Sequence, residues 1–275
     1  INKEFDMPSA TCPVVGVIQK CPKLQIQIRN EQSTDIDTRI YVYNNAIYYL
    51  DVSHNATLIG TTLNSSIANS FNAGNNTYTV KNFVNCVFNG NGVKEIYIPS
   101  GYDCDSTNYP FVGCDGAMFT SNSERGFIDT RVDEDGIPIQ SIFYIKDNND
   151  KFVLVGTSLL NNNKTLAVPE NINIIGSHSI SCSPVEKIIF ERKDDGLDTF
   201  NNYAIFGCHN LTELNFSELS AQEADDIPEL SSTHAIEDND YYLTHIAVLT
   251  NGPAVVELFK ANTMWARFTN IRSGK

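Results

Sequence analysis

The sequence predicts a mainly β protein in which short strands stack on one another as the coils of a solenoid. Three observations support this prediction. Three short segments share one apolar pattern, and two of them recur at a regular spacing. The stretch between the first and second segments carries the alternation and the turn residues of a β-hairpin.

The shared pattern places apolar residues at positions 1, 4 and 6 of residues 93–99, 185–190 and 211–216. Positions 4 and 6 of a strand point to one face, and a single short strand cannot bury that face unless neighbours stack on it. The last two segments begin 26 positions apart, which lies within the period of leucine-rich repeats. A bulky apolar residue stands five positions before each segment: Phe88, Ile180 and Phe206.

Other stretches are degenerate copies of the same unit. Residues 166–169 repeat the strand-then-proline pattern of residues 96–99, and residues 112–114 echo residues 206–208. We expect residues 246–248 to form the last strand of the stack.

The period is broken between about residues 129 and 160. Alternating runs at residues 139–145 and 152–155 flank the turn formers Asp147-Asn148-Asn149-Asp150, which predicts a β-hairpin. Residues 1–79 are also rich in strand signals, at residues 24–28, 39–43, 47–51 and 56–59, with a tight turn at Asn44-Asn45.

These patterns predict the domain organisation. We expect a β-rich N-terminal cap over residues 1–79 and a solenoid over residues 80–275. Within the solenoid, the hairpin insertion covers about residues 129–160 and a C-terminal cap around Trp265 covers about residues 241–275. We expect a short helix within residues 253–267, and a solvated acidic connection over residues 218–240.

The formal net charge of −14 and the pI of about 4.7 argue against polyanionic partners. Nucleic acid and anionic membrane surfaces would be repelled, because the sequence has no run of Lys or Arg that could overcome this field. No apolar stretch approaches the roughly 20 residues that span a bilayer, so we expect no membrane insertion.

The seven cysteines are scattered singly, with no spacing typical of a zinc site. Cys12 and Cys21 are candidates for a small disulfide-closed loop if the chain is extracellular. Cys86, Cys182 and Cys208 occupy repeat positions, and we expect them to be small buried hydrophobes. Sequons of the type N-x-S/T begin at Asn55, Asn64, Asn75, Asn163, Asn210 and Asn215, but that number is near chance in so Asn-rich a chain.

The sequence contains no catalytic motif of the common hydrolase, protease or nucleotide-binding types. Its five histidines are isolated, and the acidic runs at residues 133–135 and 147–150 do not fit an EF-hand loop. We therefore expect no enzymatic activity, no metal and no cofactor.

The residues beside the buried positions of the strands point out of the sheet and form a candidate binding face. Tyr97 is the best anchor, because an aromatic side chain brings contact area at little entropic cost. Two alternatives stay open: the face is only the solvated side of a sheet, or recognition lies in the N-terminal β region. The candidates are Glu95, Tyr97, Lys187, Ile189, Glu213, Asn215 and His245.

Four further motifs carry a resemblance to BspA-like leucine-rich repeats, which occur in bacterial surface proteins and some protists. Ile47-Tyr48-Tyr49-Leu50 with Asn55-Ala56-Thr57-Leu58 is similar to the family's entry segment, and residues 156–160 with 164–169 resemble its inserted hairpin. Residues 171–176 resemble its IPxxVxxIG element. Residues 265–271 resemble its closing W-x-x-F-x-N-I segment. Ile180 and Ile205 depart from the Ala-Phe pair usual in the family, which leaves the number of coils open.

The resemblance implies a short right-handed solenoid that acts without chemistry. It implies a secreted or cell-surface adhesion module that binds a protein or glycan through its β-lined face, although the chain itself shows no leader. The alternative is a structural component of a larger surface or virion assembly.

Overall fold

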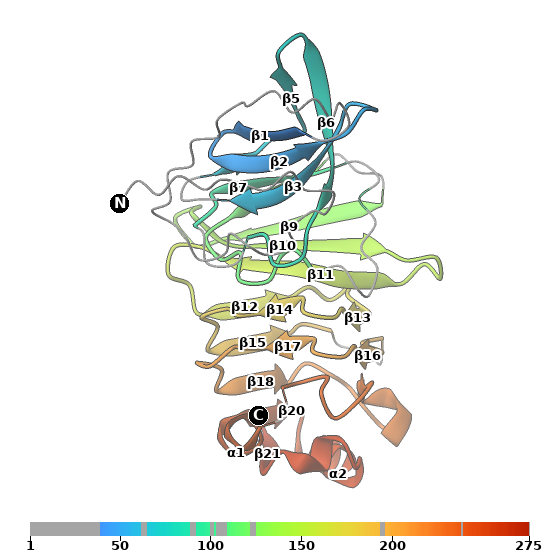
Figure 1. The fold of residues 1–275 in the computed structure, drawn as a ribbon. Helices are drawn as coiled ribbons and strands as arrows, with labels where there is room; N and C mark the ends of the chain where they lie inside the picture. The colour runs from blue at the N-terminus through green and yellow to red at the C-terminus, as the bar shows by residue number, and fades with distance from the viewer. Residues whose placement is uncertain are drawn as a thin grey trace. The chain divides into compact units, whose positions relative to one another are not determined.

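The computed structural model describes residues 39–61, 65–88, 92–99, 102, 109–121, 125–192, 196–237 and 239–274. Cys12, Cys21 and the strand expected at residues 24–28 lie outside this part of the chain. The chain divides into two compact units, Ile1–Gly126 and Phe127–Lys275, which are described separately (Figure 1). The boundary between these units lies after Gly126, not near residue 80. The expected domains, an N-terminal cap over residues 1–79 and a solenoid over residues 80–275, stay predictions.

The first unit contains a five-stranded sheet in the order β1-β2-β3-β6-β5. Its strands are β1 (Arg39–Tyr43), β2 (Ala46–Leu50), β3 (Asn55–Thr61), β5 (Ser70–Ala73) and β6 (Asn76–Phe83). Asn44 and Asn45 join β1 to β2 with φ values of 47° and 61°, the left-handed backbone that a tight hairpin turn requires. The strands expected at residues 39–43, 47–51 and 56–59 and the turn at Asn44-Asn45 are confirmed.

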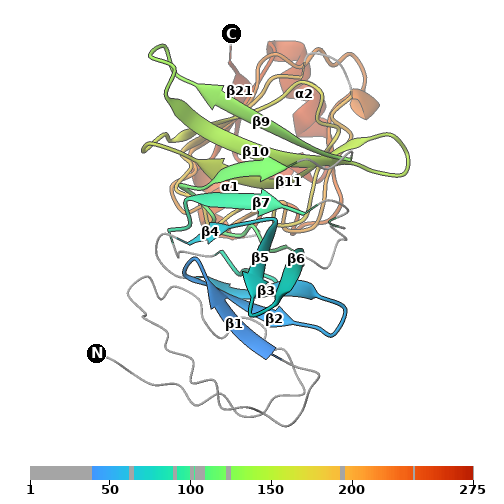
Figure 2. The same cartoon turned by 90° about the horizontal axis from the view of Figure 1, so that it is seen from above.

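The two edge strands of this sheet come together through aromatic rings. Tyr41 and Tyr43 of β1 stack on Phe71 of β5, with ring centroids 5.8 and 5.0 Å apart. Since β1 and β5 are at opposite ends of the strand order, the sheet must curl for these rings to meet (Figure 2).

A parallel three-stranded ladder in the first unit has the strand pattern of the repeat. It consists of β4 (Ser66–Ile67), β7 (Glu95–Ile98) and β8 (Met118–Ser121). Ile67, Ile96 and Phe119 are in register across it and are all buried. This confirms the alternation predicted for residues 93–99.

The second unit begins with the predicted hairpin. The hairpin consists of β10 (Pro138–Lys146) and β11 (Phe152–Leu159), and β9 (Gly126–Val132) lies next to β10 in the same sheet. β10 and β11 pair antiparallel, and the Asp147 carboxylate accepts hydrogen bonds from the backbone of Asn149 and Lys151 in the turn between them. Because β11 also pairs in parallel with β13 (Ile174–Ile175), the hairpin continues directly into the solenoid.

The solenoid coils of the second unit stack their strands in three parallel ladders, and the first two coils contribute one strand to each ladder. The front ladder consists of β12 (Thr165–Val168), β15 (Lys187–Phe190), β18 (Glu213–Phe216), β20 (Ala247–Thr250) and β21 (Asn270–Ser273). The second ladder joins β13 to β16 (Thr199–Phe200) and β19 (Glu229–Leu230). The third consists of β14 (Ile180–Ser181) and β17 (Ile205–Phe206), with a bridge from Ile205 to Ile236.

The stacked coils enclose one hydrophobic core. Each ladder supplies a row of inward side chains in register. Burial of one large apolar side chain contributes about 1.5–3 kcal/mol to the free energy of folding. The front row is Leu166, Ile188, Leu214, Val248 and Ile271. The protein is therefore a mainly β, leucine-rich-repeat-like solenoid, as predicted, and in Figure 2 its coils lie behind one another.

Helices close the C-terminal end of this unit: η1 (Ala224–Asp226), α1 (Asp240–His245), α2 (Pro253–Ala261) and η2 (Trp265–Arg267). Trp265 is fully buried, and its indole nitrogen donates a 2.7 Å hydrogen bond to the Pro228 carbonyl. The short helix predicted within residues 253–267 is confirmed. Residues 246–248 are not the last strand, because β21 pairs beyond β20.

The register corrects the alignment of the repeats by one residue. Ile180 pairs with Ile205, and not with Phe206, so the turn before β18 is one residue longer than the turn before β15. Cys182 therefore stands opposite Gly207, and both have left-handed backbone, with φ values of 53° and 65°.

The four cysteines that the structure describes differ in burial. Cys208 is buried as expected, and so is Cys114. The expectation of burial is wrong for Cys86 and Cys182, which are half-buried at left-handed turn positions with φ values of 56° and 53°. Among the described residues, no helix is long and apolar enough to cross a membrane.

Candidate interaction surface

The front ladder of the second unit presents two rows of side chains on its outer side. One row runs through Thr165, Lys187, Glu213, Ala247 and Asn270, and the other through Ala167, Ile189, Asn215, Leu249 and Arg272. The strands are parallel and in register, so equivalent residues of successive coils are direct neighbours. We call the region formed by Lys187, Ile189, Glu213, Asn215 and Leu249 the front patch.

The polar residues of the front patch interact with one another. The Lys187 ammonium lies 2.6 Å from Glu213 Oε1, and the Asn215 amide donates to the same oxygen at 3.2 Å. The side-chain oxygen Oδ1 of Asn215 in turn accepts from the backbone nitrogen of Ser217 at 2.9 Å. The side chains are thus held in place, and the opposite charges of Lys187 and Glu213 offset one another.

The apolar residues of the front patch stand in the second row. Ile189 and Leu249 are both half-buried and flank Asn215 on either side along the ladder. A row of this kind offers apolar contact area next to hydrogen-bonding groups, the combination found at the centre of protein interfaces.

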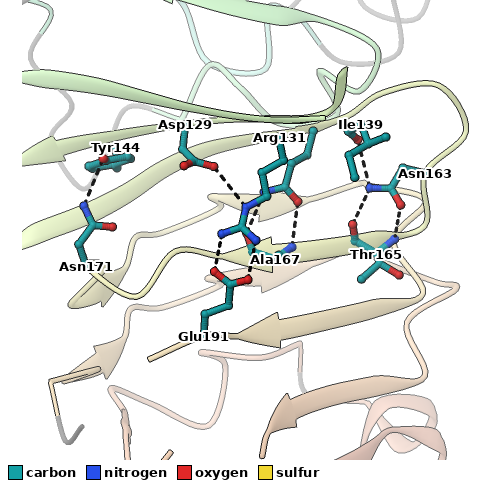
Figure 3. A network of polar contacts seen from close by, with 10 residues as sticks. Asp129, Arg131, Ile139, Tyr144, Asn163, Thr165, Ala167, Asn171 and Glu191 are labelled. Carbon is teal, nitrogen blue, oxygen red and sulfur yellow. Dashed lines mark hydrogen bonds and ion pairs between the residues drawn. The ribbon is translucent and has the colours of Figure 1, made fainter. Parts of the chain in front are cut away.

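The β12 edge of the front ladder is covered by the hairpin that precedes it (Figure 3). The side-chain amide of Gln140 donates to the Ala167 carbonyl at 2.8 Å and accepts from the Ala167 backbone nitrogen at 2.9 Å. Asn163 donates to the carbonyl oxygens of Ile139 and Thr165. An exposed strand edge invites pairing with another chain, and these amides occupy backbone groups at that edge.

Two further contacts visible in Figure 3 tie the hairpin to the coils. Nη1 and Nη2 of Arg131 donate to the two carboxylate oxygens of Glu191, and Asp129 Oδ1 lies 3.5 Å from Arg131 Nε. The hydrogen bonds to Glu191 raise the pKa of Arg131 above its usual value. The Asn171 amide donates to the Tyr144 hydroxyl at 3.2 Å.

The structure places four of the seven predicted candidates together. Lys187, Ile189, Glu213 and Asn215 lie in the front patch, on two adjacent strands. Glu95 and Tyr97 lie on β7, which belongs to the separate ladder of the first unit. Glu95 is exposed, accepting from the Ser66 hydroxyl at 3.4 Å, and Tyr97 is half-buried.

His245 was expected on a strand of this face, and the expectation is wrong. It is the last residue of α1, and Ala247 occupies the position in the row beside Glu213. The sequence pattern misled because residues 246–248 look like a strand that begins one residue before β20 and continues the alternation back to His245.

Sequence reasoning missed a row of rings at a corner of the solenoid. His178 stacks on Tyr203 with a centroid distance of 5.4 Å, and Tyr203 lies 5.7 Å from His234. Backbone hydrogen bonds link these residues in successive coils, and His178 and Tyr203 have φ values of 55° and 56°. Burial lowers the pKa of the His178 imidazole.

The titratable side chains of the described residues show no clustering for metal chemistry. No group of three or more His, Cys, Asp or Glu side chains within that part of the chain is arranged to hold a metal ion.

The fold and this surface define a β-solenoid repeat protein. No protein-family model and no curated protein matches the sequence. Solved structures with some similarity include a leucine-rich cell surface protein of Faecalibacterium prausnitzii A2-165, with 10% identity and a TM-score of 0.23, covering 73% of this chain and 98% of that one. The pneumococcal vaccine antigen PcpA has 10% identity and a TM-score of 0.20, covering 87% of this chain and 99% of that one.

Proposed function

We propose that the protein is a non-catalytic recognition module of the BspA-like leucine-rich-repeat type, which binds a protein or a glycan through the front patch. The observation that carries this proposal is the Lys187–Glu213–Asn215 network beside half-buried Ile189 and Leu249. The side chains are already ordered, so binding would cost little further side-chain entropy.

The sequence motifs that resemble the family support an extracellular or cell-surface location. The net charge of −14 disfavours nucleic acid as a partner. Within the front patch the charges of Lys187 and Glu213 offset one another, so we expect shape and hydrogen bonding to contribute more to recognition than long-range electrostatics.

The test is a binding screen of the folded chain on protein and glycan arrays. Each hit is repeated with Lys187→Ala and Glu213→Ala combined. The matched control is Lys260→Ala with Glu257→Ala, which removes an exposed Lys–Glu pair of 3.6 Å on α2. Loss of binding in the first variant alone supports the front patch.

A separate variant, Glu95→Ala with Tyr97→Ala, tests the ladder of the first unit. Loss of binding in this variant alone would move recognition to that ladder. A folded, monomeric chain that binds nothing on the arrays would argue against the recognition role.

A structural role in a larger assembly is the second candidate. It is favoured by β21, which is the last strand of the front ladder among the described residues and presents one edge without a strand partner there. Such an edge can pair with another chain. Concentration-dependent growth of the particle mass in light scattering would support this role.

A further inference from the structure

The asparagines that begin the sequons differ sharply in what their side chains do. Asn163 Nδ2 donates to the Ile139 carbonyl at 3.1 Å and to the Thr165 carbonyl at 2.7 Å. Asn215 Nδ2 donates to Glu213 within the front patch, and Asn55 Nδ2 donates to Asp51 Oδ2 at 3.0 Å. In each of these three asparagines, the side-chain nitrogen that would carry a sugar donates a hydrogen bond within the folded protein.

Two other sequon asparagines lie in exposed turns. Asn75 is in the two-residue turn of the β5–β6 hairpin, next to Gly74 with a φ of 61°. Asn210 is in the turn closed by the 3.0 Å hydrogen bond from the Leu211 backbone nitrogen to the Cys208 carbonyl. The sequon residues Thr77 and Thr212 are also exposed, and their hydroxyls donate to Asn72 Oδ1 at 2.8 Å and to the Glu186 carbonyl at 3.0 Å.

We propose that Asn75 and Asn210 are N-glycosylation sites, and that Asn55, Asn163 and Asn215 are not. In the reaction, Asn Nδ2 forms a bond to the anomeric carbon of an oligosaccharide carried on a lipid pyrophosphate. The bond from that carbon to the phosphate oxygen breaks, the lipid pyrophosphate leaves, and the amide nitrogen loses one proton to a base of the transferring enzyme.

The fold explains why the sites divide in this way. A sugar on Asn163 would replace one of its two donated hydrogen bonds and place its bulk between the hairpin and β12, beside the part-buried carbonyl oxygens of Ile139 and Thr165. A sugar on Asn215 would break the contact with Glu213 and cover the front patch. Sugars on Asn75 and Asn210 disturb no hydrogen bond of this kind and leave Asn215 in its network.

This proposal rests on the extracellular location proposed above, but its test does not depend on binding. The full chain is placed behind a secretory leader and made in eukaryotic cells. The secreted, folded monomer is then treated with a peptide N-glycosidase in heavy-oxygen water. The enzyme converts each glycosylated Asn to a heavy Asp, and mass spectrometry scores each sequon separately.

We expect heavy Asp at positions 75 and 210, and unmodified Asn at positions 55, 163 and 215. Asn75→Gln and Asn210→Gln should each remove one glycan, whereas Thr77→Ser and Thr212→Ser, which keep the sequons, should retain both. A folded monomer that carries sugar on Asn55, Asn163 or Asn215, or that lacks it on both Asn75 and Asn210, overturns the proposal. If the chain is not secreted, the same sites are scored after translation into microsomes. Sugar on Asn75 and Asn210 alone again supports the proposal, and sugar on Asn55, Asn163 or Asn215, or on neither Asn75 nor Asn210, overturns it.

Discussion

Lys187 and Glu213 occupy paired positions on neighbouring strands of the front ladder, and their side chains form an ion pair of 2.6 Å between two successive coils of the solenoid. The pair is 26 residues apart in the chain and adjacent in space because the two strands are parallel and in register. Its side chains remain 36% and 22% exposed, so water screens the attraction and limits what it adds to stability.

We expect Glu213→Gln to separate recognition from folding. A partly exposed ion pair contributes about 0.2–1 kcal/mol, so the free energy of unfolding in urea should fall by no more than that. Binding through the front patch should be lost. The double swap Lys187→Glu with Glu213→Lys should restore stability without restoring binding, and a loss of several kcal/mol in Glu213→Gln would show that the pair is a major stabilising contact.

Gln140→Met should weaken the junction between the hairpin and the first coil. Gln140 is 1% exposed, and its amide satisfies both backbone groups of Ala167 at 2.8 and 2.9 Å. Leaving buried polar groups without partners costs about 1–3 kcal/mol. Amide hydrogen exchange at Ala167 should accelerate, whereas Gln222→Met, at an exposed position, should change neither stability nor that exchange. Unchanged exchange at Ala167 would contradict the proposed capping role.

Gly176→Ala should disrupt the pairing of β11 with β13. A Cβ at this position would come within 2.3 Å of the Leu154 carbonyl oxygen, which accepts the 3.0 Å hydrogen bond from Gly176 itself. We expect a loss of about 1–3 kcal/mol, typical of overpacking, with faster amide exchange at Ile175. In Gly136→Ala the Cβ meets nothing within 4 Å, so only backbone strain at its φ of 78° remains, and exchange at Ile175 should be unaffected.

The stability of the second unit should depend on the protonation of His178. Burial lowers the folded-state pKa of His178 below the ordinary value of 6.5. As the pH falls below 6.5, the unfolded chain therefore binds the proton first, and the free energy of unfolding decreases until the folded pKa is passed. His178→Gln should reduce this slope in urea titrations at several pH values, and His245→Gln, at the exposed end of α1, serves as the control. An unchanged slope in His178→Gln would count against burial of the charge as its cause.

Several elements could be predicted from local sequence, because local patterns determine them. The hairpin followed from two alternating runs around Asp147-Asn148-Asn149-Asp150, and the β1–β2 turn followed from Asn44-Asn45, whose backbone is left-handed at φ 47° and 61°. The repeat strands followed from apolar residues at alternate positions. Trp265 was a sound marker for the closing segment, since so large a side chain needs a complete core around it.

The sequence by itself determined which residues face inward, because strand alternation and turn preference act over a few neighbouring positions. Only the tertiary structure decided which residues of different coils meet. Ile180 pairs with Ile205 because the turn before β18 is one residue longer than the turn before β15. His245 is not part of the ladder because it is the last residue of α1. The same stacking brings Gln140 to Ala167 and Lys187 to Glu213. These contacts depend on loop lengths and on the register between coils. The register is set when the whole core packs, so no short stretch of the sequence predicts it.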